Sequence, residues 1–471
     1  MVALLWPLFS PGQLALRDML VLDQPALTPS ALGWGDLPAR NAPQDGLLGL
    51  IGMAIPASWA ARALIVFGAL AGAGGAIWLS RVVGGGLVGT LAAVTIVLWN
   101  PFVVERLLQG HWSLVIAGWL LPLIAAAGLS GRTWVMWLGM WAASLTPTGA
   151  ILALLTGVIV SRARRGWTLA IGVLACLPWI IPGLTNPASG LSTSASISAF
   201  APRAEAHVGT LGALLGLGGI WNADAVPASR ETGGFALAGI LLFAVLMLGV
   251  RRVPLPLLGL AALGIGGAVF VWLAPGAMGW VVETIPGTGL FRDAGKLVVL
   301  ALPAYAALAA SLRPSLAAVA LALALLQIPD APSALQQLAP TQLEVDEELV
   351  SLANGRDVLL VDTPTLTLRP DGLPILDPHA KALSLVESGV LVVDGVVVDP
   401  PSERWVQANQ AWTERDLAKL ADLEVGAIVD NDQFTETTAE SRSVRTGLFL
   451  LIGWLLIPVA LLTARWLRRH R

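Results

Sequence analysis

The chain has 471 residues, of which 56% are hydrophobic and only 13% are charged. A soluble domain carries about 25% charged and about 45–50% apolar residues, so this composition excludes a soluble enzyme. The formal net charge is -3 and the sequence has no long basic run, which excludes a nucleic-acid-binding protein. The single cysteine, Cys176, lies in an apolar run, so a disulfide scaffold and a cysteine-based metal site are also excluded.

Apolar runs along the chain predict an α-helical polytopic membrane protein with about eleven membrane helices. Several runs are shorter than the ~20 residues of a full span, so tilted or broken helices are expected. Before them, Met1–Phe9 would cover only about 14 Å as a helix, which predicts a truncated first membrane helix. The expected helices are residues 58–80, 85–100, 112–129, 133–146, 148–161, 167–184, 235–250, 254–274, 297–311, 315–328 and 446–464.

The connections between these helices alternate in charge. One set is short, basic and free of Asp and Glu, and it includes Arg81, Arg132, Arg251 and the tail from Arg465. The other set holds all 31 acidic residues, in segments 10–57, 100–111, 185–234, 275–296 and 329–445. By the positive-inside rule the basic set is cytoplasmic. We therefore expect a multi-pass protein of the plasma membrane whose acidic loops face outside.

The same pattern divides the chain into four parts. Residues 1–57 hold the truncated first helix and the first external loop, and residues 58–328 form the polytopic membrane domain. Residues 329–445 contain 21 acidic against 8 basic residues and are the only stretch of soluble composition. Residues 446–471 are the last membrane helix and a basic cytoplasmic tail.

Residues 329–445 are expected to form a small external α/β domain. Alternating and continuous apolar runs predict strands at 358–362, 390–398 and 425–430. A helix is expected at 413–423, with Thr413 as its N-cap. Two roles are open for this domain: a lid or scaffold over the membrane part, or a glycan-binding module.

The acidic loops carry the side chains suited to chemistry. Taken singly, these side chains have ordinary structural interpretations, such as capping a turn or anchoring a helix end at the headgroups. The second loop begins with Asn100-Pro101, which predicts the start of a short helix on the outer membrane surface. The candidates are Arg17, Asp18, Asp23 and Asp36 in the first loop, Glu105, Arg106, Gln109 and His111 in the second, Trp221, Asn222 and Arg230 in the third, and Arg292, Asp293 and Lys296 in the fourth.

Together these loops place acids and cations on one face of a polytopic protein. A lipid-phosphate substrate enters from the bilayer with its head at that level, and Arg and Lys bind phosphate through charge-assisted hydrogen bonds. A nearby carboxylate suits general-base catalysis toward a sugar hydroxyl, which is typically worth ~10²–10⁴ in rate. A cation such as Arg292 or Lys296 would stabilise the phosphate as it leaves the anomeric carbon.

Four segments carry a resemblance to known proteins. They read LALRDMLVLDQPALTPSALGWGD, NPFVVERLLQGHW, LLGLGGIWNADAVPASRE and IPGTGLFRDAGK, and they lie in this order within residues 10–310. They resemble the actinobacterial membrane arabinofuranosyltransferases of the α-(1→3) branching type, members of the GT-C superfamily of polytopic glycosyltransferases. The resemblance implies a GT-C-like fold, a polyprenyl-phosphate sugar donor and a cell-envelope glycan acceptor. It also implies transfer on the outer face of the membrane and a catalytic Asp in the first external loop.

The resemblance implies roles for the candidate residues. Asp18 would deprotonate the acceptor hydroxyl, with Asp23 and Asp36 as alternatives for this role. The donor phosphate would be held by Arg292 and Lys296, together with Arg106 and His111. Further substrate contacts are expected from Arg17, Glu105, Gln109, Trp221, Asn222, Arg230 and Asp293. The sequence shows no dedicated metal site, and because GT-C enzymes differ in their need for metal, a divalent-cation cofactor stays open.

Two other classes of protein compete with this interpretation. A transporter or lipid flippase needs ionisable residues at mid-membrane, and the predicted helix centres are almost free of them. A non-catalytic envelope-assembly or glycan-binding protein would have the same membrane topology but would not catalyse sugar transfer. We therefore predict a membrane glycosyltransferase, with the assembly protein as the alternative. Arabinofuranose is favoured as the sugar by resemblance, and mannose is next.

Overall fold

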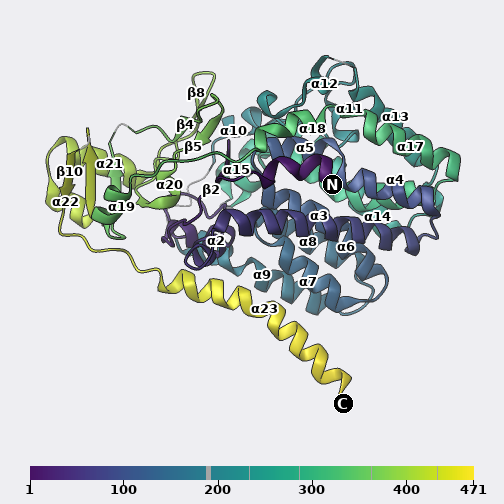
Figure 1. Cartoon of the computed structure of the whole chain (residues 1–471), viewed down its shortest axis with the longest axis horizontal. Coiled ribbons are helices and arrows are strands. Elements are labelled where there is room, and N and C mark those ends of the chain that lie inside the picture. The colour runs from purple at the N-terminus through teal and green to yellow at the C-terminus, as the bar shows by residue number, and fades with distance from the viewer. Residues whose placement is uncertain (187–191, 233, 286, 362, 432, 471) are drawn as a thin grey trace.

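The computed structural model describes residues 1–186, 192–232, 234–285, 287–361, 363–431 and 433–470. It consists of a helical body and a smaller lobe of strands and short helices, which lies at one end of the body (Figure 1). We call residues 347–436 the α/β lobe. After the lobe, the last helix, α23 (Arg445–Arg469), returns to the body and packs against α7 and α9.

The α-helices of the body are, in chain order, α1 (Val2–Leu5), α2 (Gln44–Gly52), α3 (Ala57–Val82), α4 (Leu87–Leu98), α5 (Pro101–Leu108), α6 (Trp112–Leu129), α7 (Thr133–Ala143), α8 (Pro147–Val160), α9 (Arg165–Thr185), α10 (Ala195–Ala199), α11 (Gly209–Leu215), α12 (Ala228–Thr232), α13 (Ala236–Met247), α14 (Leu255–Leu273), α15 (Pro275–Thr284), α16 (Leu302–Ser311), α17 (Pro314–Leu326), α18 (Ala331–Ala334) and α23. Its 3₁₀ helices are η1 (Trp6–Phe9), η2 (Ser30–Leu32), η3 (Ala223–Ala225), η4 (Val250–Arg252), η5 (Thr288–Phe291), η6 (Ala294–Ala301) and η7 (Leu335–Leu338). A two-stranded hairpin, β1 (Leu14–Leu16) and β2 (Met19–Val21), precedes α2.

Eight helical segments among the described residues are long and apolar enough to cross a membrane, as expected of a multi-pass membrane protein. All eleven segments predicted from the sequence fall on helices. Three of them, α7, α8 and α13, have only 11, 14 and 12 residues, so eleven full spans are not confirmed. One spanning segment, Leu87–Leu108, joins α4 to α5.

α6 is the central helix of the body, because 94% of its length is buried inside the chain. It packs against α3, α7 and α8. Small residues of α3 let the two helix backbones come close, as is common between membrane helices. A Cβ atom at Gly75 would lie 2.3 Å from the Leu123 backbone nitrogen, so glycine is required at this point of contact.

The helix predicted at the start of the second loop is present, but its predicted location is wrong. The Asn100 side chain caps α5 by accepting a 3.0 Å hydrogen bond from the Val103 N–H. Every residue of α5 is buried, whereas a helix on the membrane surface would expose one face. Its burial is possible because Glu105 and Arg106 meet oppositely charged groups or backbone donors inside the body.

The α/β lobe is built on a four-stranded sheet in the order β10-β9-β3-β6. β3 is parallel to both β6 and β9, and β10 is antiparallel to β9. Leu359, Leu420 and Ile428 lie in its core. The lobe contains α19 (Glu347–Ala353), β3 (Asp357–Leu360), β4 (Leu366–Leu368), β5 (Pro374–Leu376), α20 (His379–Ala382), β6 (Ser384–Leu385), β7 (Leu391–Val393), β8 (Val396–Asp399), α21 (Glu403–Thr413), α22 (Leu417–Asp422), β9 (Ala427–Asp430) and β10 (Gln433–Glu436).

Two predictions about the lobe are wrong in detail. Residues 390–398 form the β7–β8 hairpin rather than one strand, because Asp394 and Gly395 both adopt positive φ and make a two-residue turn. Thr413 ends α21 instead of capping a helix. The next helix, α22, is capped by the Asp416 carboxylate, which accepts a 2.8 Å hydrogen bond from the Lys419 N–H.

The strand predicted at 358–362 is β3, which begins one residue earlier at Asp357 and ends at Leu360. The last predicted residue of this strand, Asp362, lies outside the described residues. The predicted strand at 425–430 is β9. An α/β arrangement is therefore present within residues 329–445, and its first residues, α18 and η7, pack with the helical body.

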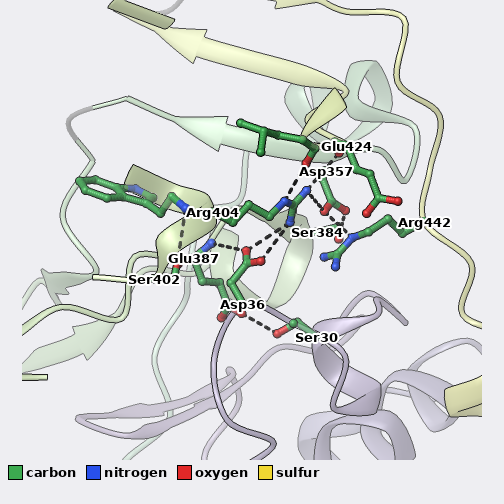
Figure 2. Close-up of polar contacts among 12 residues, drawn as sticks. Ser30, Asp36, Asp357, Ser384, Glu387, Ser402, Arg404, Glu424 and Arg442 are labelled. Atoms are coloured by element: carbon green, nitrogen blue, oxygen red, sulfur yellow. Dashed lines mark hydrogen bonds and ion pairs between the residues drawn. The ribbon is translucent and has the colours of Figure 1, made fainter. Parts of the chain in front are cut away.

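Buried ion pairs fasten the lobe to the first loop. Figure 2 shows Arg404 of α21 between Asp36 of the first loop and Asp357 of β3. The Arg404 guanidinium lies 3.2 Å from an Asp36 oxygen and 2.6 Å from an Asp357 oxygen. A second pair joins Lys381 of the lobe to Asp45 at 2.6 Å. Because buried carboxylates are costly without a cation, these pairs hold the loop and the lobe together.

The contact between α3 and α6 makes the first testable prediction. We expect Gly75→Ala to lower the stability of the body by about 1–3 kcal/mol, because the added Cβ meets the backbone of α6. Gly74→Ala is the matched control, since a Cβ there has nothing within 4 Å. Thermal unfolding in detergent measures both variants. Equal melting temperatures for the two variants would contradict the predicted close approach.

Candidate functional site

The β1–β2 hairpin carries Asp18 at its tip. Its strands pair Leu14 with Val21 and Leu16 with Met19, which leaves Arg17 and Asp18 as the connecting residues. Arg17 has a φ of 49°, unusual for a residue other than glycine. Its guanidinium donates to the Leu108 carbonyl at 2.7 Å and to the Asp224 carbonyl at 2.6 Å. Arg17 therefore fixes the hairpin tip, and its predicted contact with substrate stays a prediction.

The tip of this hairpin lies directly against the end of α5. The Asp18 N–H donates to the Gln109 carbonyl at 3.2 Å. A Cβ atom at Gly110 would stand 2.3 Å from the Met19 nitrogen and 2.6 Å from the Leu16 carbonyl oxygen. Gly110 also has a φ of 91°. Both its conformation and its lack of a side chain let the hairpin reach this position.

Asp18 forms two hydrogen bonds through one carboxylate oxygen. Gln109 Nε2 donates to Oδ2 at 3.0 Å, and His111 Nε2 lies 3.0 Å from the same oxygen. The other ring nitrogen, His111 Nδ1, faces Arg106 at 3.4 Å. A guanidinium only donates hydrogen bonds, so Nδ1 accepts and the ring proton sits on Nε2, pointing to Asp18. The Asp18 side chain is 49% exposed, which leaves its second oxygen accessible.

The protonation states at this pair follow from its surroundings. Partial burial acts to raise the pKa of Asp18, but the hydrogen bonds from His111 and Gln109 and the charge of Lys296 hold that pKa below its usual value. Burial, together with the nearby charges of Lys296 and Arg106, lowers the pKa of His111 against the opposing effect of Asp18. At neutral pH the pair is therefore a carboxylate hydrogen-bonded to a neutral imidazole.

A buried ion pair, Arg106–Asp293, lies beside Asp18 and His111. Both guanidinium end nitrogens of Arg106 donate to the Asp293 carboxylate, one of them at 2.9 Å. Burial acts to raise the pKa of Asp293, yet Arg106 and Lys296 hold it well below the usual range. Lys296 Nζ is 3.7 Å from Asp293 and 21% exposed, so it is the more accessible cation of the two.

The four-residue spacing of Arg292 and Lys296 predicts that both lie on one face of an α-helix, and this is wrong because the segment is not α-helical. Residues Ala294–Ala301 form the 3₁₀ helix η6. In a 3₁₀ helix side chains three apart eclipse one another, which places Lys296 over Asp293. Arg292 instead turns to the α/β lobe and binds Asp399 at 2.6 and 2.8 Å. Its guanidinium also stacks on Phe200, 4.1 Å from the ring centre.

A second cluster of buried charged residues holds the backbone of the third loop. Glu105 accepts a 3.0 Å hydrogen bond from the Ile220 N–H, and Glu205 accepts one from the Gly219 N–H at 3.2 Å. Glu205 is also paired with Arg230, and both side chains are fully buried. These contacts fix the loop backbone directly before Trp221 and Asn222. Glu105 and Arg230 are thus positioned to hold this loop.

The third loop connects to Asp18 through Gln109. Asn222 Nδ2 donates to Gln109 Oε1 at 2.7 Å, while Gln109 Nε2 donates to Asp18. Trp221 packs edge-on against Phe200, with ring centres 4.6 Å apart. Its indole N–H has no hydrogen-bond partner among the described residues. Asn222 and its neighbour Trp221 therefore lie next to the Gln109–Asp18 contact, and their role in binding substrate stays a prediction.

The two alternative acids of the first loop lie elsewhere. Asp23 is hydrogen-bonded by the Ser58 hydroxyl, and its carbonyl accepts the Ala57 N–H, so it supports the start of α3. Asp36 is 4% exposed and is bound to Arg404 and to the Glu387 N–H. Both carboxylates are engaged in structural contacts, whereas Asp18 is half exposed.

A small surface hollow adjoins Lys296 between η5, η6 and α8. Asp293 and Lys296 form its charged end, and apart from Thr148 its remaining wall is apolar, made of Ile151, Leu152, Leu290, Phe291 and Leu297. This combination suits a ligand with an anionic head and an apolar tail. Among the described residues, no group of three or more His, Cys, Asp or Glu side chains is placed to hold a metal ion.

Sequence reasoning missed three residues near the site. Arg40 and Asp399 form part of the Arg292 contact, and Glu205 supports the third loop. Asp399 is one of 21 acidic residues within 329–445, and no local pattern distinguishes it from the others. Its pairing with Arg292 spans 107 residues of sequence, so only the folded chain reveals it.

The multi-pass helical body, with a first loop whose hairpin tip meets the end of α5, has a GT-C type of fold. The chain is similar to the solved structure of the arabinofuranosyltransferase AftD from Mycobacteria, with a TM-score of 0.54 and 18% sequence identity. A mutant form of the same enzyme matches with a TM-score of 0.49 and 20% identity. No protein-family profile and no curated protein matches the chain.

The alignment covers a much larger share of this chain than of the mycobacterial enzyme. The alignment covers 91% of this chain and 34% of the mycobacterial enzyme, so the chain spans about a third of that enzyme's length. At 18% identity the likeness establishes the fold. The predicted GT-C-like architecture is thereby confirmed.

The contact at Gly110 gives the second prediction. We expect Gly110→Ala to lower the free energy of unfolding by about 1–2 kcal/mol, because alanine disfavours the left-handed backbone conformation. The clash of its Cβ with the β1–β2 hairpin should lower it by about 1–3 kcal/mol more. Gly131→Ala is the matched control, because Gly131 has a φ of 67° but nothing within 4 Å of its Cβ position. Thermal unfolding should therefore show the larger loss for Gly110→Ala. Equal losses of thermal stability in the two variants would contradict the close contact between the hairpin and Gly110.

Proposed function

We propose that the protein is an integral membrane glycosyltransferase that moves a sugar from a polyprenyl phosphate to a cell-envelope glycan. The observation that carries the proposal is the half-exposed Asp18 carboxylate, held by Gln109 and His111 beside Lys296 at the end of a hollow with apolar walls. The likeness in fold to a mycobacterial arabinofuranosyltransferase supports the same chemistry. Arabinofuranose is the favoured sugar and mannose the next candidate.

Asp18 is the general base in this proposal. Its lowered pKa keeps it ionised at neutral pH, and its free oxygen accepts the proton of the acceptor hydroxyl. His111 and Gln109 leave that oxygen free, because both bond to the other one. As the acceptor oxygen forms its bond to the anomeric carbon, the bond from that carbon to the phosphate oxygen breaks.

The donor phosphate binds at the charged end of the hollow. Lys296 is the partly exposed cation there, and Arg106 adds positive charge from behind Asp293. The negative charge that develops on the departing phosphate is stabilised by these preplaced cations. The apolar wall of the hollow receives the first part of the polyprenyl chain.

The active loops and the α/β lobe face the outside of the plasma membrane in this proposal. The distribution of basic residues in the opposite connections supports this orientation. The acceptor approaches Asp18 from the exposed side, near Trp221 and Asn222. The indole N–H of Trp221 is buried and has no partner among the described residues, so it would become a donor to a sugar hydroxyl only if the acceptor displaced its neighbours.

Asp18→Asn tests the assignment of the base. We expect the rate of transfer to fall by about 10²–10⁴-fold, because the amide cannot accept the hydroxyl proton. The measurement uses labelled decaprenyl-phosphoryl arabinose, then the mannose donor, with envelope-glycan acceptors and membranes containing the full chain. Asp23→Asn is the matched control from the same loop, compared at equal expression.

The outcomes of this assay separate the candidate functions. Transfer that survives Asp18→Asn but is lost in Asp23→Asn or Asp36→Asn would move the base to the affected residue. The absence of transfer from both donors by the wild type would leave a non-catalytic envelope-assembly or glycan-binding protein as the better description.

The pKa directions predict the acid side of the pH profile. Protonation of His111 places a cation against Asp18 and weakens the carboxylate as a base, so transfer falls as the pH drops through the pKa of His111. Because that pKa lies below its ordinary value of 6.5, kcat should keep more than half of its neutral-pH value at pH 6.5. Turnover at saturating donor, measured between about pH 5 and pH 8, tests this. Full recovery on return to neutral pH is the control, and half-loss above pH 6.5 would contradict the assignment.

A further inference from the structure

A second group of charges lies next to the site and belongs partly to the α/β lobe. Arg292 binds both carboxylate oxygens of Asp399, and Arg40 of the first loop lies 3.6 Å from the same carboxylate. Asp399 is the last residue of β8, so the β7–β8 hairpin brings it to the body. The Thr193 hydroxyl donates to the Val398 carbonyl at 2.5 Å and fixes the approach of this strand.

The arrangement has the features of an anion-binding site occupied by a carboxylate. Arg292 is only 9% exposed and is stacked on Phe200, so its guanidinium stays in place whatever anion it meets. Arg40 is 48% exposed and lines the open side. Two guanidinium groups on one anion are a common recognition pattern for phosphate.

This group is electrostatically continuous with the candidate site. Arg292 precedes Asp293 in the chain, and Asp293 is paired with both Arg106 and Lys296. Four cations, Arg40, Arg106, Arg292 and Lys296, face the three carboxylates Asp18, Asp293 and Asp399, which leaves one positive charge in excess.

We propose that Arg40 and Arg292 form a binding site for the phosphate of a lipid phosphate, and that Asp399 is the resident carboxylate with which this phosphate exchanges. The proposal rests on the proposed function for the identity of the lipid. A donor phosphodiester carries one negative charge, which balances the excess already present. The monoester left after transfer carries about 1.5 to 2 negative charges at pH 7, so it competes more strongly for the two arginines.

The exchange gives the lobe a role in the release of product. When Asp399 returns to Arg292 and Arg40, it replaces the lipid phosphate with a carboxylate of the protein itself. Without this carboxylate, the two arginines keep their positive charge and hold the phosphate. Asp399 is therefore a residue that sets the affinity for the product.

The first test measures binding of decaprenyl phosphate to the full chain in lipid nanodiscs. Asp399→Asn should bind this lipid about tenfold more tightly than the wild type, because the competing charged partner of the arginines is gone. Asp394→Asn is the matched control, since it removes the same charge from the same hairpin at an exposed residue in the turn. Equal affinities for Asp399→Asn and Asp394→Asn would overturn the proposal.

Two further variants keep the test independent of folding. Arg292→Gln should weaken binding of decaprenyl phosphate by about tenfold, and Arg40→Gln should weaken it in the same direction. Arg40 is half exposed, so its variant tests the site even if Arg292→Gln fails to fold. Unchanged affinity in a folded Arg40→Gln variant would remove Arg40 from the site.

The probes distinguish the sources of the anion. Decaprenol, which lacks the phosphate, should show no difference between the wild type and Asp399→Asn. Inorganic phosphate at the same concentration should not displace the lipid, and equal competition by it would overturn the assignment to a lipid phosphate.

A kinetic readout links the site to turnover. With the concentration of the active sugar donor varied up to saturation, Asp399→Asn should lower kcat and also lower KM for that donor, because tighter product binding slows release. If the wild type transfers no sugar while the binding results hold, the proposed glycosyltransferase fails and the anion site stands. If transfer occurs but the binding results do not hold, only the exchange at Asp399 fails.

Discussion

The buried pair Arg106–Asp293 is the interaction on which the geometry of the site depends. Moving one of these charges into the body alone would cost several kcal/mol, so neither is stable there without the other. The pair joins α5 to the start of η6 across 187 residues of sequence. Once α5 and η6 are fixed to each other, His111 at the end of α5 and Lys296 on η6 are fixed as well. The tip of the β1–β2 hairpin then packs against Gly110, where Asp18 meets His111.

Glu105, the neighbour of Arg106 on α5, fixes the third loop in a similar way. Glu105 holds the backbone of the third loop at Ile220, while Arg106 holds η6. Two adjacent residues of one buried helix thus position two distant segments. This explains why a short helix with charged residues is enclosed in an apolar body: its charges are what assemble the loops.

Local patterns in the sequence were enough for the helices and for part of the site. Hydrophobic runs located eleven helices and Asn100-Pro101 gave the start of α5, whereas the choice of Asp18 as the base came from the resemblance and stays a prediction. The burial of α5 was missed because the partners of its charged residues, Asp293 and the Ile220 N–H, lie far along the chain. Arg292 and Lys296 were misplaced because the sequence does not distinguish an α-helix from the 3₁₀ helix that η6 adopts. Contacts that depend on chain distance or helix type were thus beyond local patterns.

The α/β lobe is attached to the body by contacts of unequal strength. At its base, Arg404 and Lys381 meet carboxylates that are nearly excluded from water, so these pairs resist separation. At the β7–β8 hairpin, the Arg292–Asp399 pair is similarly buried, but Asp399 also meets the half-exposed Arg40. Water screens the charges at Arg40, and there one anion can replace another. Local opening occurs first where few groups are buried, and the exposed Val392, Val396 and Val397 add little packing to this hairpin. The lobe therefore stays fixed to the first loop, while its contact nearest Lys296 is the one that can change.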